Sequence, residues 1–134
     1  MNKPVALVTG ASRGLGAELA KILSLTHHVV AVSRTIGALE ALDDQITKCG
    51  GSSTLAPIDL TDENAVAQLC RSIFDRWGKV RIWVHTAIHA APLGPVITID
   101  SKDWEESIAS NVTALAKLIP MVSPLLEKGS KAVF

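Results

Sequence analysis

Short apolar runs alternate along the chain with longer segments in which apolar residues recur at helical spacing. The runs of strand length comprise residues 5–10, 28–33, 53–60, 80–87 and 131–134. Their nearly continuous apolar character is typical of strands that are covered on both faces of a sheet. Strands and helices follow each other with short joints, which favours parallel strands connected by right-handed crossovers. The pattern therefore predicts an α/β fold with a doubly wound, Rossmann-like parallel sheet of about five strands.

The intervening segments predict helices whose apolar faces pack against this sheet. The side chains expected to face the sheet are Leu15, Leu19, Ile22 and Leu23 in the first helix, and Leu39, Leu42 and Ile46 in the second. Thr61 is expected to cap the third helix, whose apolar stripe continues until Gly78. No repeat or low-complexity linker interrupts the chain, so we expect residues 1–134 to form one domain.

The composition is that of a packed globular domain without a net charge. Hydrophobic residues make up 48% of the chain and charged residues 19%, a balance that excludes disorder. The 13 basic and 13 acidic side chains cancel, so we expect neither a nucleic-acid nor a membrane partner. The first residues lack the features of a signal peptide, and we expect a cytoplasmic protein. Cys49 and Cys70 lack the spacing of a zinc or redox motif.

The most informative stretch is VTGASRGLG, residues Val8 to Gly16, where the first predicted strand turns into the first helix. Gly10, Gly14 and Gly16 leave the backbone free of side chains that would keep a phosphate at a distance. The N–H groups and the positive dipole at the start of the helix then face that phosphate. Glycines also occur in such turns for steric reasons alone, but three in this register favour phosphate binding over packing.

The same stretch resembles the T-G-x-x-x-G-x-G fingerprint of the short-chain dehydrogenase/reductase family. Asp59-Leu60 resembles the family's aspartate-containing pair near the cofactor adenine ring, and residues 103–114, DWEESIASNVTA, resemble its fourth helix. The cofactor-binding residues that this resemblance implies are Gly10, Ser12, Arg13, Gly14, Leu15, Gly16, Asp59, Leu60 and Ala87. An FAD or S-adenosylmethionine protein with the same fold fits the glycine spacing less well.

Two arginines indicate which dinucleotide is bound. Proteins that prefer NAD usually place an acidic residue after the second strand, where it accepts from the ribose 2′-hydroxyl. This chain has Ser33-Arg34-Thr35 there instead. Arg34 and Arg13 can clamp a 2′-phosphate with charge-assisted hydrogen bonds, so we expect NADP(H) in preference to NAD(H). The alternative is that both arginines are solvated surface charges.

The end of the fourth predicted strand departs from the family pattern. His85-Thr86-Ala87-Ile88 stands where the family has N-N-A-G, and only Ala87 matches. The family's asparagines tie neighbouring strands together and its glycine leaves space beside the cofactor ribose, so Ile88 is expected to crowd that position. His85 and His89 straddle a strand end and a loop without an obvious third ligand, so we expect no metal site.

The fourth predicted helix carries one polar residue on its apolar stripe. The stripe consists of Trp104, Ile108, Asn111 and Leu115. We expect Trp104 to lie in the core and the Asn111 amide to be buried with polar partners. Asn111 either satisfies backbone groups at a distorted turn or, as the resemblance implies, holds a water in a proton relay beside the catalytic lysine. Pro120 and Pro124 are expected to kink or end the helix.

The resemblance extends only to the N-terminal part of a family member. In the family, the fifth strand leads to a serine that steadies the substrate carbonyl and then to a Tyr-x-x-x-Lys pair for acid–base chemistry. This chain contains no tyrosine. We therefore expect part of an NADP(H)-dependent oxidoreductase that interconverts an alcohol and a carbonyl, truncated relative to the family and inactive by itself. The alternative is a non-catalytic nucleotide-binding or interaction module. The edge formed by residues 131–134 is expected to favour homo-oligomers.

Overall fold

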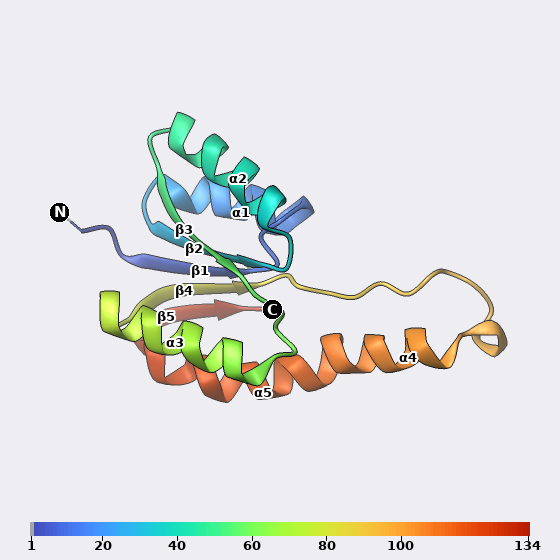
Figure 1. Cartoon of the computed structure of the whole chain (residues 1–134). Helices are drawn as coiled ribbons and strands as arrows, with labels where there is room; N and C mark the ends of the chain where they lie inside the picture. Colours follow the sequence, from blue (N-terminus) through green and yellow to red (C-terminus); the bar gives the residue numbers. More distant parts are fainter. Residues whose placement is uncertain (1) are drawn as a thin grey trace.

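A computed structural model describes residues 2–134 and contains a sheet of five parallel strands (Figure 1). The strands are β1 (Val5–Thr9), β2 (His28–Ser33), β3 (Ser52–Pro57), β4 (Val80–His85) and β5 (Leu126–Val133). They lie side by side in the order β3-β2-β1-β4-β5. The order reverses beside β1, and ligands of such sheets bind at the carboxyl ends of the strands at this point. The predicted doubly wound α/β fold is therefore confirmed.

The helices divide between the two faces of the sheet. Their bounds are α1 (Gly14–Ser24), α2 (Ile36–Lys48), α3 (Glu63–Trp77), α4 (Ser101–Ile108) and α5 (Ala114–Val122). α1 and α2 cover one face and α3 and α5 the other (Figure 1). Successive strand residues point to opposite faces, so Leu7 joins the core under α3 and α5 while Val8 joins the core under α1 and α2. The predicted α2 face of Leu39, Leu42 and Ile46 is fully buried.

Helix α1 packs on the sheet mainly through small residues; of the predicted face, Leu23 packs against the core, whereas Leu15 and Ile22 do not. Its buried residues are Gly16, Ala20 and Ser24, which follow each other at a spacing of four. Leu15 and Ile22 are 67% and 62% exposed. The helix begins directly after a tight turn and lies against it, so only small side chains fit on the inner face. Larger side chains are thereby turned toward solvent.

The start of α3 also differs from the prediction. Asp62, not Thr61, is the capping residue, and its carboxylate accepts a hydrogen bond from the Ala65 N–H at 3.2 Å. Thr61 instead donates to Oδ1 of Asp59, from its N–H at 2.9 Å and from its hydroxyl at 2.8 Å. These bonds close a short turn that fixes the carboxylate just beyond β3.

A long helical segment connects α4 to the last strand. A π-helical turn, Ala109–Thr113, joins α4 to α5, and the 3-10 turn Ser123–Leu125 ends the segment. Pro120 lies inside α5 without ending it, whereas Pro124 lies in the terminal turn as expected. Trp104 is 57% exposed, so its predicted core position is wrong. α4 extends past the sheet (Figure 1), and none of its described residues is buried.

The same segment, Ser101–Leu125, is long and apolar enough to span a membrane, with a mean hydropathy of 1.3. This criterion concerns length and composition alone, and core helices of soluble proteins also meet it. Here α5 contributes Leu118 and Val122 to the core beneath the sheet. Only 22% of the apolar 18-residue stretch within this segment is buried.

Candidate functional site

The carboxyl ends of the three central strands lie level with one another. Thr9 of β1 is in register with Val32 of β2 on one side and with His85 of β4 on the other. The chain leaves β1 through the glycine turn, residues 10–13, and enters α1 at Gly14. The turn therefore sits at the centre of the edge where the fold places ligands.

Gly10 is required at its position for two reasons. Its φ is 88°, which L side chains rarely adopt, and a Cβ there would overlap the backbone nitrogen of Ala87. The N–H groups of Gly10 and Ala11 both donate to the carbonyl oxygen of Val32, at 2.9 and 3.0 Å. The turn is thus pressed against the end of β4 and hydrogen-bonded to the end of β2.

The other two glycines serve different purposes. A Cβ on Gly16 would overlap the carbonyl oxygen of Gly10 and approach the Thr86 Oγ1 to 2.5 Å. Gly14 has a φ of 57° with no heavy atom within 4 Å of its Cβ position. Gly16 therefore allows close packing of helix on turn, whereas Gly14 allows the backbone to enter the helix.

The first turn of α1 is suited to an anion. Arg13 precedes the helix, none of the side chains in residues 2–134 caps its N-terminus, and its first turn contains no acidic residue. The N–H groups at the start of a helix have no intrahelical acceptors and carry partial positive charge. An anion placed at this turn would therefore meet free donors, the helix dipole and a guanidinium.

Thr86 joins β4 to the glycine turn and was not predicted to have a specific role. Its N–H donates to the carbonyl oxygen of Thr9 at 2.8 Å, and its hydroxyl lies 3.0 and 3.1 Å from the carbonyl oxygens of Thr9 and Gly10. These bonds provide the tie between strands that the family's asparagines are thought to supply. A hydroxyl one residue beyond a strand end gives no distinctive sequence signal.

His85 contributes to a buried cluster behind this tie. Its Nδ1 lies 2.7 Å from the Thr9 hydroxyl, which also accepts from the Trp83 indole N–H at 3.2 Å. Burial lowers the pKa of His85 below its ordinary value of 6.5, so the neutral ring is favoured. His85 is thus a half-buried residue hydrogen-bonded to the core residue Thr9. Ile88 is 74% exposed, so its side chain is accessible to a ligand at this edge of the sheet.

Arg34 follows the end of β2 and faces the acidic turn after β3. The pKa of Asp59 is lowered, chiefly by the hydrogen bond from the Thr61 N–H and also by the positive charge of Arg34. Arg34 and Arg13 are both exposed. Their guanidinium groups are therefore available to a ligand at the carboxyl edge.

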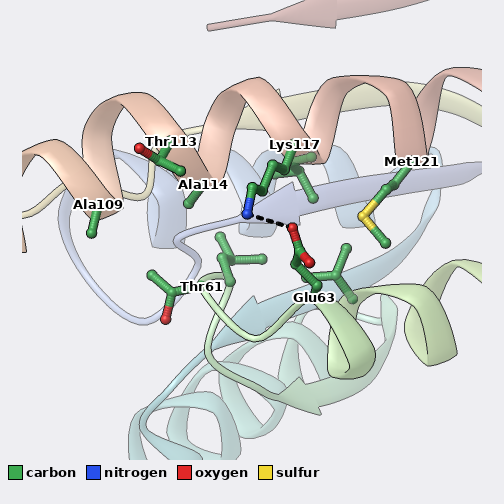
Figure 2. A pocket seen from close by; sticks show the side chains of 10 residues that line it. Thr61, Glu63, Ala109, Thr113, Ala114, Lys117 and Met121 are labelled. Atoms are coloured by element: carbon green, nitrogen blue, oxygen red, sulfur yellow. Dashed lines mark ion pairs between the residues drawn. The ribbon is translucent and has the colours of Figure 1, made fainter.

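A small cavity of about 120 Å³ lies between the start of α3 and the helical segment (Figure 2). Its lining residues are Leu60, Thr61, Glu63, Val66, Ala109, Thr113, Ala114, Lys117, Leu118 and Met121. The Lys117 ammonium pairs with the Glu63 carboxylate across it at 2.7 Å. Drug-sized ligands occupy at least about 300 Å³, so this cavity suits part of a ligand at most. The ion pair was not predicted, because its residues are far apart in sequence.

Asn111 lies in the π-helical turn and is exposed, which contradicts the expected burial of its amide. Its Oδ1 accepts from the N–H of His89 at 2.8 Å, and its Nδ2 donates to the carbonyl oxygen of His89 at 2.8 Å. The amide therefore holds the backbone of one loop residue from both sides. This geometry matches the expected satisfaction of backbone groups at a distorted turn.

The structure brings most of the predicted cofactor residues to one edge. The glycine turn, Ala87 and Arg34 all follow the ends of the central strands, and Asp59 and Leu60 follow β3. Leu60 also packs against the core under α3. Ser12 is half-buried within the turn. Leu15 projects outward from the first turn of α1 and is available to a ligand as an apolar contact.

The parallel sheet and the glycine turn between β1 and α1 define an α/β protein of the Rossmann type. The model of the short chain dehydrogenase family matches residues 4–133. The chain belongs to this family.

Curated relatives are described as reductases and dehydrogenases. A fatty acyl-CoA reductase of Acinetobacter baylyi is 32% identical over 126 residues, which cover 92% of this chain and 43% of the relative. An NADP-dependent 3-hydroxy acid dehydrogenase of Salmonella typhimurium is 29% identical over 121 residues, 90% of this chain and 48% of the relative. The chain thus spans about half the length of the curated relatives that it matches.

Solved structures agree with this assignment. A metagenomic short-chain oxidoreductase in complex with NADP superposes with a TM-score of 0.84 and 32% identity, covering 92% of this chain and 57% of that one. A dehydrogenase/reductase from Sinorhizobium meliloti gives a TM-score of 0.84 and 29% identity, with 98% and 53% covered.

Proposed function

We propose that this chain forms the cofactor-binding part of an NADP(H)-dependent short-chain oxidoreductase that interconverts an alcohol and a carbonyl. The observation that carries the proposal is the turn between β1 and α1. Gly10 and Gly16 contact neighbouring backbone so closely that neither position accepts a side chain. Such a turn at the start of an uncapped helix favours a pyrophosphate as its ligand.

The remaining cofactor contacts follow from the positions of the strand ends. In the proposal, the pyrophosphate lies against the first turn of α1, from Ser12 to Gly16. The adenine lies beside Asp59 and Leu60, and the ribose lies near Ala87. Each of these groups stands at the carboxyl edge, which supports a single ligand that spans them.

The preference for NADP(H) rests on charge. Arg34 stands where NAD-dependent proteins usually carry an acid, and Arg13 adds a second exposed guanidinium. If each charge-assisted contact contributes about 1.5–3 kcal/mol, the pair would favour the phosphorylated cofactor by about a hundredfold or more. The Salmonella relative and the metagenomic neighbour are themselves described with NADP.

The bound nicotinamide would supply hydride transfer, and this chain would supply its binding and orientation. The chain contains no tyrosine, so the family's tyrosine acid is not among its residues. Asn111 remains the candidate for the peripheral proton-relay position. We propose that its amide acts there by fixing the His89 backbone, and that these 134 residues alone do not reduce carbonyls.

Cofactor titration tests the proposal directly. The purified chain is titrated with NADPH and with NADH, and binding is followed by calorimetry and by nicotinamide fluorescence. We expect 1:1 binding of NADPH at least tenfold tighter than that of NADH, and no NADPH oxidation with carbonyl substrates. Absence of binding would contradict the cofactor site, and equal affinities would contradict the NADP preference.

A non-catalytic nucleotide-binding or interaction module is the second candidate. The observation in its favour is His85-Thr86-Ala87-Ile88, which replaces the family motif while Thr86 preserves the tie between strands. Joining this chain to the tyrosine-containing half of a relative distinguishes the two functions. Carbonyl reduction by the joined protein would support an oxidoreductase, whereas NADPH binding without reduction would support a module.

We further propose that the protein is cytoplasmic and self-associates. Exposed apolar side chains follow the outer helical segment; they are Trp104, Ile108, Val112 and Ile119. β5 is also an edge strand of the sheet. Sedimentation of the wild type and of Trp104→Glu tests self-association, which the charged variant is expected to weaken.

A further inference from the structure

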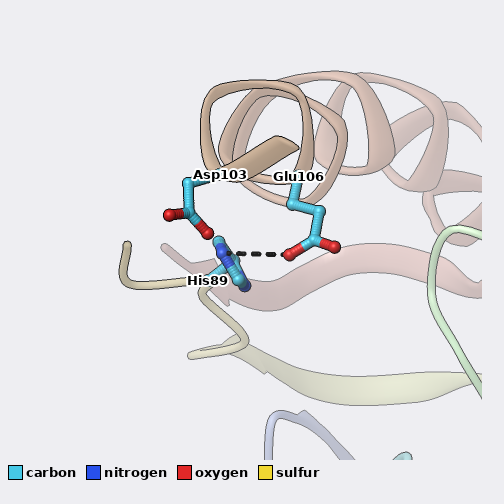
Figure 3. A group of neighbouring side chains, drawn as sticks. All are labelled: His89, Asp103 and Glu106. Atoms are coloured by element: carbon cyan, nitrogen blue, oxygen red, sulfur yellow. Dashed lines mark ion pairs between the residues drawn. The ribbon is translucent and has the colours of Figure 1, made fainter. Parts of the chain in front are cut away.

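Three side chains point toward one another where the segment after β4 meets α4 (Figure 3). His89 comes from that segment, and Asp103 and Glu106 come from the helix. Each offers one ligand atom of a kind that binds metal ions, and these three atoms lie within 4.8 Å of one another. None of the three residues is among the proposed cofactor contacts.

The His89 ring nitrogen in this cluster is unsatisfied. Its Nε2 is buried and has no hydrogen-bond partner within residues 2–134. The nearest carboxylate oxygen, Oε2 of Glu106, is 3.5 Å away, which is too long for a strong hydrogen bond. A buried polar atom without a partner requires an explanation, and an ion bound beside it is one of the recognised explanations.

One pair of donors has the spacing of two ligands of the same ion. Zinc binds imidazole nitrogen and carboxylate oxygen at about 2.0–2.2 Å, so two ligands of a tetrahedral ion lie about 3.4 Å apart. The separation of 3.5 Å between His89 Nε2 and Glu106 Oε2 is close to this value. Direct hydrogen bonding would bring the two atoms closer together.

Two features hold the donors in place before any ion binds. The Asn111 side chain forms hydrogen bonds with both backbone polar groups of His89, at 2.8 Å each. Asp103 and Glu106 are three residues apart, so they share one face of α4. Asp100 caps this helix by accepting from the Lys102 N–H at 3.2 Å. The entropy cost of assembling the site is therefore reduced.

We propose that His89, Asp103 and Glu106 bind a divalent transition-metal ion, with Zn²⁺ as the preferred ion. One imidazole and two carboxylates suit zinc, and the carboxylates compensate the ion's charge. Water would complete the coordination. The proposal replaces the expectation of no metal site, which rested on the apparent lack of a third ligand for His85 and His89. His85 is engaged with Thr9, and the further ligands come from α4.

The ion would fasten the loop after β4 to the long helix. This loop also carries Ala87 and Ile88 at the edge of the candidate cofactor site. Lys102 is the neighbouring cation, with its ammonium 3.8 Å from Oε1 of Glu106, the carboxylate oxygen that does not face His89. The ammonium therefore leaves Oε2 available to the ion.

Zinc titration of this chain tests the proposal. The protein is first treated with a chelator and dialysed, and ZnCl₂ is then titrated by calorimetry and in competition with a chromophoric chelator. We expect one zinc site per chain and shifts of the His89 ring signals in NMR spectra. His89→Gln, Asp103→Asn and Glu106→Gln should each weaken zinc binding by at least about tenfold.

Matched controls separate this site from surface binding. His27→Gln removes an imidazole elsewhere, and Glu105→Gln removes a carboxylate from the same helix outside the cluster. Both controls should keep wild-type zinc affinity, and circular dichroism should confirm that every variant is folded. Failure of the wild type to bind zinc, or equal losses in the controls, would overturn the proposal. His89 ring signals that do not shift when zinc is added would overturn it as well.

Discussion

The hydroxyl of Thr86 lies 3.1 Å from the carbonyl oxygen of Gly10 and so connects β4 to the turn proposed to hold the cofactor. Gly16 packs against the same hydroxyl and the same carbonyl group. One side chain thus stabilises both the end of the sheet and the start of the helix.

Replacing Thr86 by Val should separate the contribution of this hydrogen bond to stability from the contribution of side-chain packing. Valine keeps the shape of threonine but leaves the Gly10 carbonyl oxygen without its hydroxyl donor. We expect the free energy of unfolding to fall by about 1–3 kcal/mol and NADPH binding to weaken. Urea denaturation and cofactor titration measure the two effects. Thr86→Ser keeps the hydroxyl and should retain most of both properties; equal losses in the two variants would contradict the role of the hydrogen bond.

Gly16→Ala should disrupt the turn, because its Cβ would overlap the Gly10 carbonyl oxygen. We expect loss of NADPH binding together with a lower unfolding temperature. Gly37→Ala is the matched control, since nothing lies within 4 Å of its Cβ position in α2. That change should stabilise the protein by about 0.5–1 kcal/mol and leave binding intact. Normal NADPH affinity in Gly16→Ala would show that the turn is not the cofactor site.

Arg34→Ala should lower NADPH affinity by at least about tenfold while NADH affinity stays the same. The reason is that only NADPH carries the 2′-phosphate that the guanidinium would contact. Parallel titrations with both nucleotides measure the difference. Arg71→Ala, which removes an exposed arginine of α3, should change neither affinity. A uniform loss for both nucleotides in Arg34→Ala would assign Arg34 to general binding instead.

Protonation of His85 should make the fold less stable in mild acid. Its pKa in the folded state is lowered by burial from the ordinary 6.5, so the unfolded chain takes up the proton more readily. The free energy of unfolding should therefore be highest above about pH 6.5 and fall as the pH decreases below that value. His85→Asn should show a weaker decrease when urea denaturation is measured across this range. Burial also lowers the pKa of His28, so protonation of His28 should still contribute to the loss of stability in the variant.

The order of secondary-structure elements was predictable because the apolar runs of a parallel sheet are nearly continuous and the apolar residues of the helices recur at helical spacing. The face that each helix buries was harder to predict. α2 buries Leu39, Leu42 and Ile46 as its pattern indicates, since it lies directly on the sheet. α1 follows a tight turn and must pack closely, so small residues displace the larger ones from its inner face.

Local motifs in the site were visible in the sequence, whereas contacts between distant residues were not. The three glycines lie close together in sequence, in the turn after β1 and the first residues of α1, and the backbone geometry there follows from local constraints. His89 meets Asp103 and Glu106 only because the intervening loop folds back on α4. Trp104 was expected in the core because periodicity cannot reveal that α4 extends beyond the sheet. Asn111 was expected to be buried for the same reason.

The Val32 carbonyl oxygen accepts two hydrogen bonds from the glycine turn, and these bonds also hold the turn at a fixed distance from the end of β2. Arg34 is two residues beyond Val32, so its backbone lies close to the part of β2 that is hydrogen-bonded to the glycine turn. The separation between the Arg34 backbone and the turn is therefore limited by these two bonds. Discrimination between NADP(H) and NAD(H) would accordingly depend on this backbone spacing. One residue inserted between Val32 and Arg34 would alter the spacing while leaving every charge in the chain unchanged.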